Sequence, residues 1–176
     1  MQIGPMLAEA ENLDMKAVAR VAQKATLEEI YLVDAKANRD PLVMPSETLS
    51  LKYAYSSNIL QSTKDNLPIH CKFSVAAFNP KKPDNIVMTI EASFCVSYII
   101  KALSDVNTND IEQFSKINPI YNLWSYWREF VQSMTTRMGF PLLTIPLLTV
   151  IPKKPAKEQA KRGAKGKPTP RKKANA

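Results

Sequence analysis

Three stretches of the chain alternate apolar and polar residues with a period of two, and this pattern restricts the fold more than any other feature. The stretches are residues 48–56, 68–78 and 86–100, and the longest keeps apolar residues at every second position from Ile86 to Ile100. Successive side chains of a strand point to opposite faces of its sheet, so each strand has one apolar face. The pattern predicts an antiparallel sheet covered on one side.

A fourth strand is predicted at residues 26–33, which read TLEEIYLV and are rich in the β-branched and aromatic residues that strands favour. Its alternation is imperfect, unlike that of the other three. The turn-forming sequence NPKKPDN at residues 79–85 separates the stretches 68–78 and 86–100. We therefore expect those two strands to form a hairpin.

An N-terminal helix is predicted at residues 6–24, where apolar residues recur at steps of three and four. Its apolar face either packs on the chain's own sheet or binds a partner. Residues 104–119 are polar and are expected to form a loop, with a short helix around residues 110–115.

The strongest helical pattern covers residues 124–139. Ser125 can cap or begin this helix, Gly139 ends it, and Pro141 prevents its continuation. Its apolar stripe consists of Trp124, Trp127, Phe130, Val131, Met134 and Met138.

An apolar segment without charged residues, FPLLTIPLLTVI, follows at residues 140–151. Pro141 and Pro146 exclude an ordinary helix, so the segment is expected to be extended. It must lie in a groove or be exposed as a binding surface.

The basic charge of the chain is concentrated in residues 153–176. The segment holds ten of the chain's 24 Lys and Arg residues but only one of its 16 Asp and Glu residues. The rest of the chain therefore has 14 basic and 15 acidic residues and is nearly neutral. The segment has no aromatic or branched aliphatic residue and is expected to be disordered. The candidates for binding an anionic partner are Lys153, Lys154, Lys161, Arg162, Arg171, Lys172 and Lys173.

Together these elements predict an α+β fold. We expect a four-stranded antiparallel sheet with a long amphipathic helix packed on it, an N-terminal helix, and a disordered basic C-terminal tail. The domain is expected to span residues 1–152 and the tail residues 153–176.

Catalytic and metal-binding residues are not expected. The one histidine, His70, neighbours Cys71 in a strand, and adjacent strand residues point to opposite faces. Only Gly4 and Gly139 precede the basic segment, so no glycine-rich phosphate loop can form, and no cofactor is expected. An active site assembled from distant residues remains an alternative.

The two cysteines, Cys71 and Cys95, lie in apolar strand-like runs and are expected to be buried free thiols. A disulfide remains an alternative if their strands pair. The N-terminus lacks the basic start and apolar run of a signal peptide, and no uninterrupted apolar stretch is long enough for a membrane span. The expected location is the cytoplasm.

Two motifs carry a resemblance to a known family. LWSYWRE at residues 123–129, followed by SMTTRMGFPLLTIP at residues 133–146, resembles the SecB export chaperones, in which similar motifs open and close the long helix. The likeness covers roughly residues 26–150. The stretch LDMKAVAR at residues 13–20 is more similar to SecB-like chaperones encoded with toxin–antitoxin pairs.

The chain departs from the family pattern in three places. Ser125 stands where the family usually has proline, and either residue suits the start of a helix. The family's second C-terminal helix is replaced by the basic tail, and that helix contributes to its tetramer and client groove. One position of the sheet carboxylates that dock the SecA motor in the family is matched here by Thr89, which is not acidic, with Glu91 two residues on.

The resemblance implies an ATP-independent chaperone, or holdase, that binds unfolded polypeptide on apolar surface, either for protein export or for guarding an antitoxin. Its implied partners are unfolded clients, further copies of the chain in a dimer or tetramer, and SecA or an antitoxin. A nucleic-acid-associated protein acting through salt-sensitive contacts of the basic tail, and an oligomer without chaperone activity, are the alternatives. The candidate client-binding residues are Trp124, Trp127, Phe130, Phe140, Leu142, Leu143, Ile145 and Leu147, among which Trp127 also fits a core position.

Overall fold

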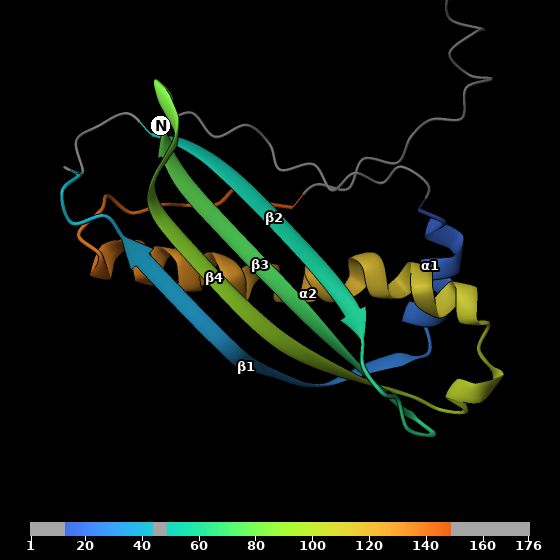
Figure 1. Ribbon diagram of the computed structural model, residues 1–176. Coiled ribbons are helices and arrows are strands. Elements are labelled where there is room, and N and C mark those ends of the chain that lie inside the picture. The colour runs from blue at the N-terminus through green and yellow to red at the C-terminus, as the bar shows by residue number, and fades with distance from the viewer. Residues whose placement is uncertain (1–12, 44–48, 149–176) are drawn as a thin grey trace, which may run out of the picture.

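The computed structural model describes residues 13–43 and 49–148 (Figure 1). The basic segment 153–176, with all seven candidates for binding an anionic partner, lies outside this described part. The described elements are α1 (Met15–Ala22), β1 (Ala25–Arg39), β2 (Ser50–Ile59), β3 (Asn66–Asn79), β4 (Lys82–Ile100), the 3-10 turn η1 (Leu103–Asp105) and α2 (Thr108–Arg137).

The four strands form one antiparallel sheet in the order β1-β4-β3-β2, which confirms the predicted α+β class. All four predicted strands are present, and β1 continues to Arg39, well beyond the predicted end. β3 and β4 pair from Asn66 opposite Ile99 to Asn79 opposite Lys82. The predicted hairpin is therefore confirmed.

Two β-bulges explain the imperfect alternation of β1. Its pairing with β4 shifts register between Leu27 and Glu29 and again between Leu32 and Asp34. Each bulge inserts one extra residue, so the side chains that follow it change face relative to a strict period of two. Leu27 and Leu32 consequently share one face although they are an odd number of residues apart.

One face of the sheet is covered, and the alternation of β3 shows which residues it buries. Ile69, Phe73 and Val75 are at most 2% exposed, whereas Lys72 on the other face is exposed. The Phe73 ring stacks on the indole of Trp127 from α2, with centroids 5.5 Å apart. Figure 1 shows α1 and α2 on the same side of the sheet, which leaves the opposite face open among the described residues.

The short helix α1 packs mainly on α2, and neither of the two predicted positions, on the sheet or on a partner, describes it. Asp14 caps α1 by accepting two backbone N–H groups at 2.9 and 3.2 Å. Val18 and Val21 are buried, and Arg20 forms a two-bonded ion pair with Asp110 of α2, with both bonds 2.7 Å long. The apolar face of α1 is thus occupied within the chain.

The long helix starts at Thr108, much earlier than the predicted start at residue 124. The predicted loop at residues 104–119 was wrong for most of its length, because the polar residues of this stretch indicated a loop and not a helix. Asn107 caps the helix, and Phe114 and Ile117 are buried against the rest of the fold. Burial of these side chains outweighs the cost of a proline inside the helix.

Candidate functional site

The extended segment that follows α2 turns back and runs antiparallel along the helix. Gly139 makes the turn with φ = 72°, a left-handed conformation that favours glycine. After the turn, later residues of the segment reach earlier residues of the helix. Residue 144 contacts Gln132, residue 145 contacts Arg128, and residue 146 contacts Trp124.

Side chains of α2 replace the backbone hydrogen bonds that this segment cannot make in a sheet or helix. The Trp124 indole N–H donates to the Pro146 carbonyl at 2.9 Å, and Arg128 Nε donates to the Ile145 carbonyl at 2.7 Å. The Leu143 amide donates to Thr135 Oγ1 at 3.3 Å. These contacts satisfy polar groups of a segment in which prolines remove donors.

The segment divides the predicted client-binding residues into two classes. Phe140, Leu143 and Ile145 are 9%, 4% and 0% exposed, whereas Leu142 and Leu147 are 64% and 69% exposed. The prediction that all five line an open groove does not hold in this conformation, because three of them fill the chain's own core. Trp124 and Trp127 of the helix stripe are buried as well, and Phe130 is half-buried.

Two open grooves lie between the exposed side of α2 and the segment. One, of about 440 Å³, is lined mostly by apolar groups of Tyr121, Trp124, Leu147 and Leu148, with Arg128 at its side. The other, of about 370 Å³, is lined by Leu142 and by polar side chains of the last turns of α2 from Glu129 to Arg137.

Sequence reasoning missed Tyr121, which is 64% exposed and lines the larger groove. The residue lay at the edge of the expected loop, so no helical face was assigned to it. Its spacing of four residues from Ser125, and of seven from Arg128, would have placed all three on one side of a continuous helix.

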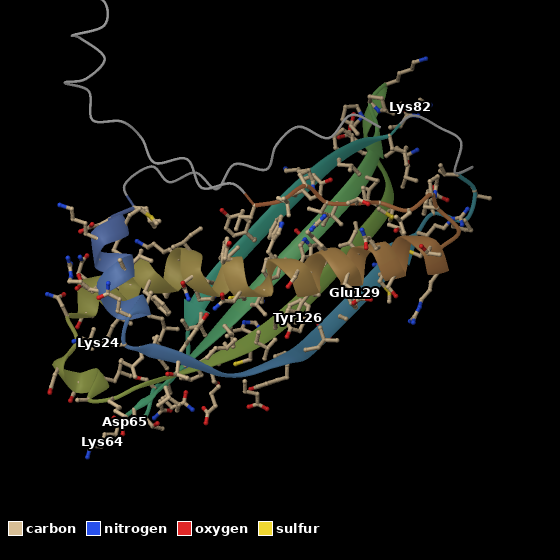
Figure 2. The ribbon with its side chains drawn as sticks, turned by 180° about the vertical axis from the view of Figure 1, so that it is seen from behind. Lys24, Lys64, Asp65, Lys82, Tyr126 and Glu129 are labelled. Atoms are coloured by element: carbon tan, nitrogen blue, oxygen red, sulfur yellow. The ribbon has the colours of Figure 1, made fainter. Side chains whose placement is uncertain are left out.

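A second apolar surface lies on the side of α2 that faces β1. Leu27 and Leu32 of this edge strand lie on the covered face of the sheet and are 46% and 49% exposed, whereas Tyr31, opposite Cys95, belongs to the open face. Tyr126 of α2 is 50% exposed, and Figure 2 shows it on the helix where α2 crosses in front of the sheet. An exposed apolar edge strand is a ready site for pairing with another chain.

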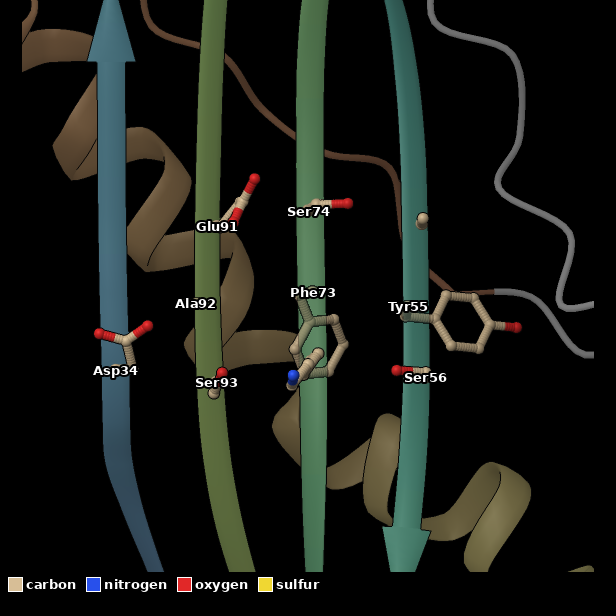
Figure 3. A pocket seen from close by; sticks show the side chains of 10 residues that line it. Asp34, Tyr55, Ser56, Phe73, Ser74, Glu91, Ala92 and Ser93 are labelled. Atoms are coloured by element: carbon tan, nitrogen blue, oxygen red, sulfur yellow. The ribbon is translucent and has the colours of Figure 1, made fainter.

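The open face of the sheet is polar and carries charges of both signs. Figure 3 shows a shallow pocket there, with Asp34 on β1, Glu91 on β4, and serines from three strands around it. Lys72 also lines this pocket, and Lys36 lies opposite Glu91 in the register. This surface is not uniformly acidic.

The register separates the two cysteines. Cys71 lies opposite Phe94 and Cys95 opposite His70, so the two thiols point to opposite faces of the sheet, and both are free and buried. This rules out the alternative of a disulfide. Burial raises the pKa of the Cys71 thiol to about 12, which keeps it protonated and unreactive.

The register also brings His70 beside Cys95, a neighbour that the sequence could not assign. Within residues 13–43 and 49–148, no group of three or more His, Cys, Asp and Glu side chains is placed to hold a metal ion. In the same part of the chain, neither helix combines the length and apolar character needed to cross a membrane.

Comparison with solved structures identifies the architecture. The chain superimposes on a SecB-like chaperone of Mycobacterium tuberculosis, solved in complex with a peptide from an antitoxin, with a TM-score of 0.68 and 19% identity over 76% of this chain and 97% of that one. The chain has the SecB-like fold. A protein of unknown function from Streptococcus agalactiae matches with a TM-score of only 0.40 and 10% identity, over 70% of this chain and 97% of that one. No protein-family model and no curated protein sequence matches the chain.

Proposed function

We propose that this SecB-like chain is an ATP-independent chaperone that holds unfolded polypeptide in the two grooves beside α2, through the apolar side chains exposed there. The observation that carries the proposal is the exposure of Tyr121, Leu142 and Leu147 around those grooves. Large apolar side chains that cluster in an open groove, rather than lying singly on the surface, are typical of interaction sites.

The energetics support holding without an energy source. Apolar burial stabilises a complex by roughly 25 cal/mol per Å², so a client covering several hundred Å² gains roughly 10 kcal/mol before ordering costs. Aromatic and leucine side chains supply this area without requiring one precise geometry. Release then follows from a competing partner or from folding of the client.

No nucleotide site or catalytic step is part of this proposal. Only two glycines, Gly4 and Gly139, precede the basic segment, and Gly139 forms the turn after α2, so no glycine-rich phosphate loop is formed there. The chain acts as a binding protein, and we propose that it acts in the cytoplasm.

For the client class, we propose that an antitoxin is favoured over general export substrates. The structural neighbour of Mycobacterium tuberculosis was solved with an antitoxin peptide. The open face of this sheet balances Asp34 and Glu91 with Lys36 and Lys72, so it lacks the acidic character by which the resemblance implies SecA docking.

We also propose that the chain is a homo-oligomer that uses the exposed edge of β1. Leu27, Leu32 and Tyr126 are about half exposed beside this edge, and burying them in a second copy would remove both unpaired backbone groups and apolar surface from water. Static light scattering should give a dimer or tetramer, and a monomer at micromolar concentration would contradict the proposal.

The groove is tested by the double variant Leu142→Asp/Leu147→Asp, with Leu42→Asp as the matched control. Leu42 is 90% exposed, lies in the turn after β1 and lines neither groove. Fully burying a leucine contributes about 1.5–3 kcal/mol. Because both groove leucines are roughly two-thirds exposed, we expect the double variant to lose at least about tenfold in affinity.

The readout is the fluorescence anisotropy of labelled, reduced and carboxymethylated α-lactalbumin, a permanently unfolded chain. The Leu42→Asp control should bind like the parent, and both variants should unfold at the parent's temperature. If the double variant and the control bind the unfolded chain with equal affinity, the grooves are not the client-binding site.

A further inference from the structure

The segment at residues 140–148 is bound to α2 in the way that a separate extended peptide would be bound. Its backbone carbonyls at Ile145 and Pro146 accept from Arg128 and Trp124, at 2.7 and 2.9 Å. Such contacts are made to the main chain, so they do not depend on the sequence of the segment. Any extended peptide lying in the same place could make them.

The side-chain pattern of the segment is equally transferable. Phe140, Leu143 and Ile145 point into the core, while Leu142 and Leu147 between and after them point outward. The buried positions thus follow a pattern of an aromatic residue with aliphatic residues three and five positions later. Unfolded chains contain many stretches of this composition, whereas folded proteins keep them in their interiors.

We propose that this segment occupies the surface along α2 that binds an extended client peptide, and that it acts there as an intramolecular competitor. A client binds by displacing the segment. The inference rests on the proposed function and specifies its ligand. The ligand is an extended, uncharged stretch with an aromatic residue followed by aliphatic residues at the third and fifth positions after it.

The ends of the segment have features that suit displacement. The open grooves at Leu142 and at Leu147 lie beside its two ends, where an incoming chain can make its first contacts. At the turn, Arg39 donates to the Met138 carbonyl and its guanidinium lies 4.8 Å from the centre of the Phe140 ring. Gly139, with its positive φ, is the residue at which the backbone direction would change.

Displacement exchanges one set of contacts for a similar set. A client that fills the same positions restores the buried apolar area and the bonds to Arg128 and Trp124, so the exchange has no large inherent cost. The tethered segment nevertheless competes at an effective concentration of about millimolar order. Long unfolded chains, which present several suitable stretches, therefore bind, and short or folded partners bind poorly.

The decisive experiment fixes the segment on the helix. Gln132 Nε2 lies 3.1 Å from Thr144 Oγ1, and both side chains are accessible, so Gln132→Cys/Thr144→Cys can be joined by the short thiol cross-linker dibromobimane. Cys71 and Cys95 are buried and stay unmodified in the folded protein. The matched control is the same double variant before cross-linking.

The probe is the labelled, carboxymethylated α-lactalbumin described above. Because Gln132 lines the smaller groove, the uncross-linked variant and not the parent is the reference. We expect the cross-linked form to bind at least about tenfold more weakly than this reference. If the cross-linked form binds within twofold of its control, clients use only the open grooves, and displacement is refuted while the proposed function stands. If the parent itself does not bind, the proposed function fails and displacement fails with it.

A second measurement needs no variant. The Leu143 amide donates to Thr135 Oγ1 when the segment is docked, so its hydrogen exchange reports displacement directly. Saturating client should accelerate exchange at this amide by about fivefold or more. Unchanged or slower exchange in the client-bound protein would overturn the inference.

Discussion

Replacing Ile145 with alanine should destabilise the protein strongly, although the residue lies in a segment without regular secondary structure. The side chain is 0% exposed within the core, and the substitution removes three carbon atoms. At about 0.8 kcal/mol per buried methylene the transfer loss is about 2.4 kcal/mol, and the cavity left behind brings the expected cost to about 3 kcal/mol. The control Leu147→Ala removes a side chain that is 69% exposed and should cost less than about 0.5 kcal/mol.

Urea unfolding followed by tryptophan fluorescence measures both variants. Trp124 and Trp127 are the two tryptophans of the chain, and the Trp124 indole bonds to the segment, so the signal reports its environment. With a slope of about 2 kcal/mol per molar urea, Ile145→Ala should lower the midpoint by about 1.5 M. All proteins are compared at one concentration, because self-association would contribute to stability. Equal midpoints for the two variants would refute the core assignment and restore the open groove expected from sequence.

Three further outcomes follow from the structure and sequence. The Arg20 guanidinium lowers the pKa of Asp110, so their ion pair stabilises the fold above about pH 4 and is lost as pH falls through the lowered pKa. Asp110→Asn should therefore melt at a lower temperature than the parent at pH 7, and the difference in melting temperature should disappear in acid. A difference that does not depend on pH would contradict the assignment. Because the Cys71 pKa is about 12 and Cys95 is also buried, neither thiol should react with Ellman's reagent at pH 8 until urea unfolds the protein, and rapid labelling of the native protein would show the burial to be wrong. Truncation after Pro152 should leave the melting temperature and client holding unchanged while weakening salt-sensitive binding to RNA, and loss of folding would refute the domain boundary.

The strands could be predicted because burial of one sheet face leaves a period of two in the sequence. The apolar series from Ile86 to Ile100 and the turn before it determined β4 and its hairpin partner. β1 was harder to delimit, because two bulges interrupt its alternation and part of its apolar surface remains exposed. The turn predicts that β3 and β4 pair but not which residues lie opposite each other, so the neighbours Cys95 and His70 emerged only from the register.

The candidate site could be predicted only in part, because its hydrogen-bond partners come from distant residues. The sequence correctly indicated an extended segment after Gly139, since two prolines exclude a helix there. It could not indicate that Trp124, Arg128 and Thr135 would supply the missing partners and allow Ile145 to be buried. The polar residues before Pro119 likewise misled the prediction of α2, because burial of Phe114 and Ile117 outweighs the local preference.

The aggregation of a reduced protein shows whether this SecB-like chain holds unfolded polypeptide without ATP. Insulin reduced by dithiothreitol aggregates and scatters light, and dithiothreitol does not threaten the free cysteines of this chain. The purified protein at roughly one oligomer per insulin B chain should suppress the scattering, and added ATP should not change the result. Scattering that rises at the same rate in a several-fold molar excess of the protein would contradict the claim.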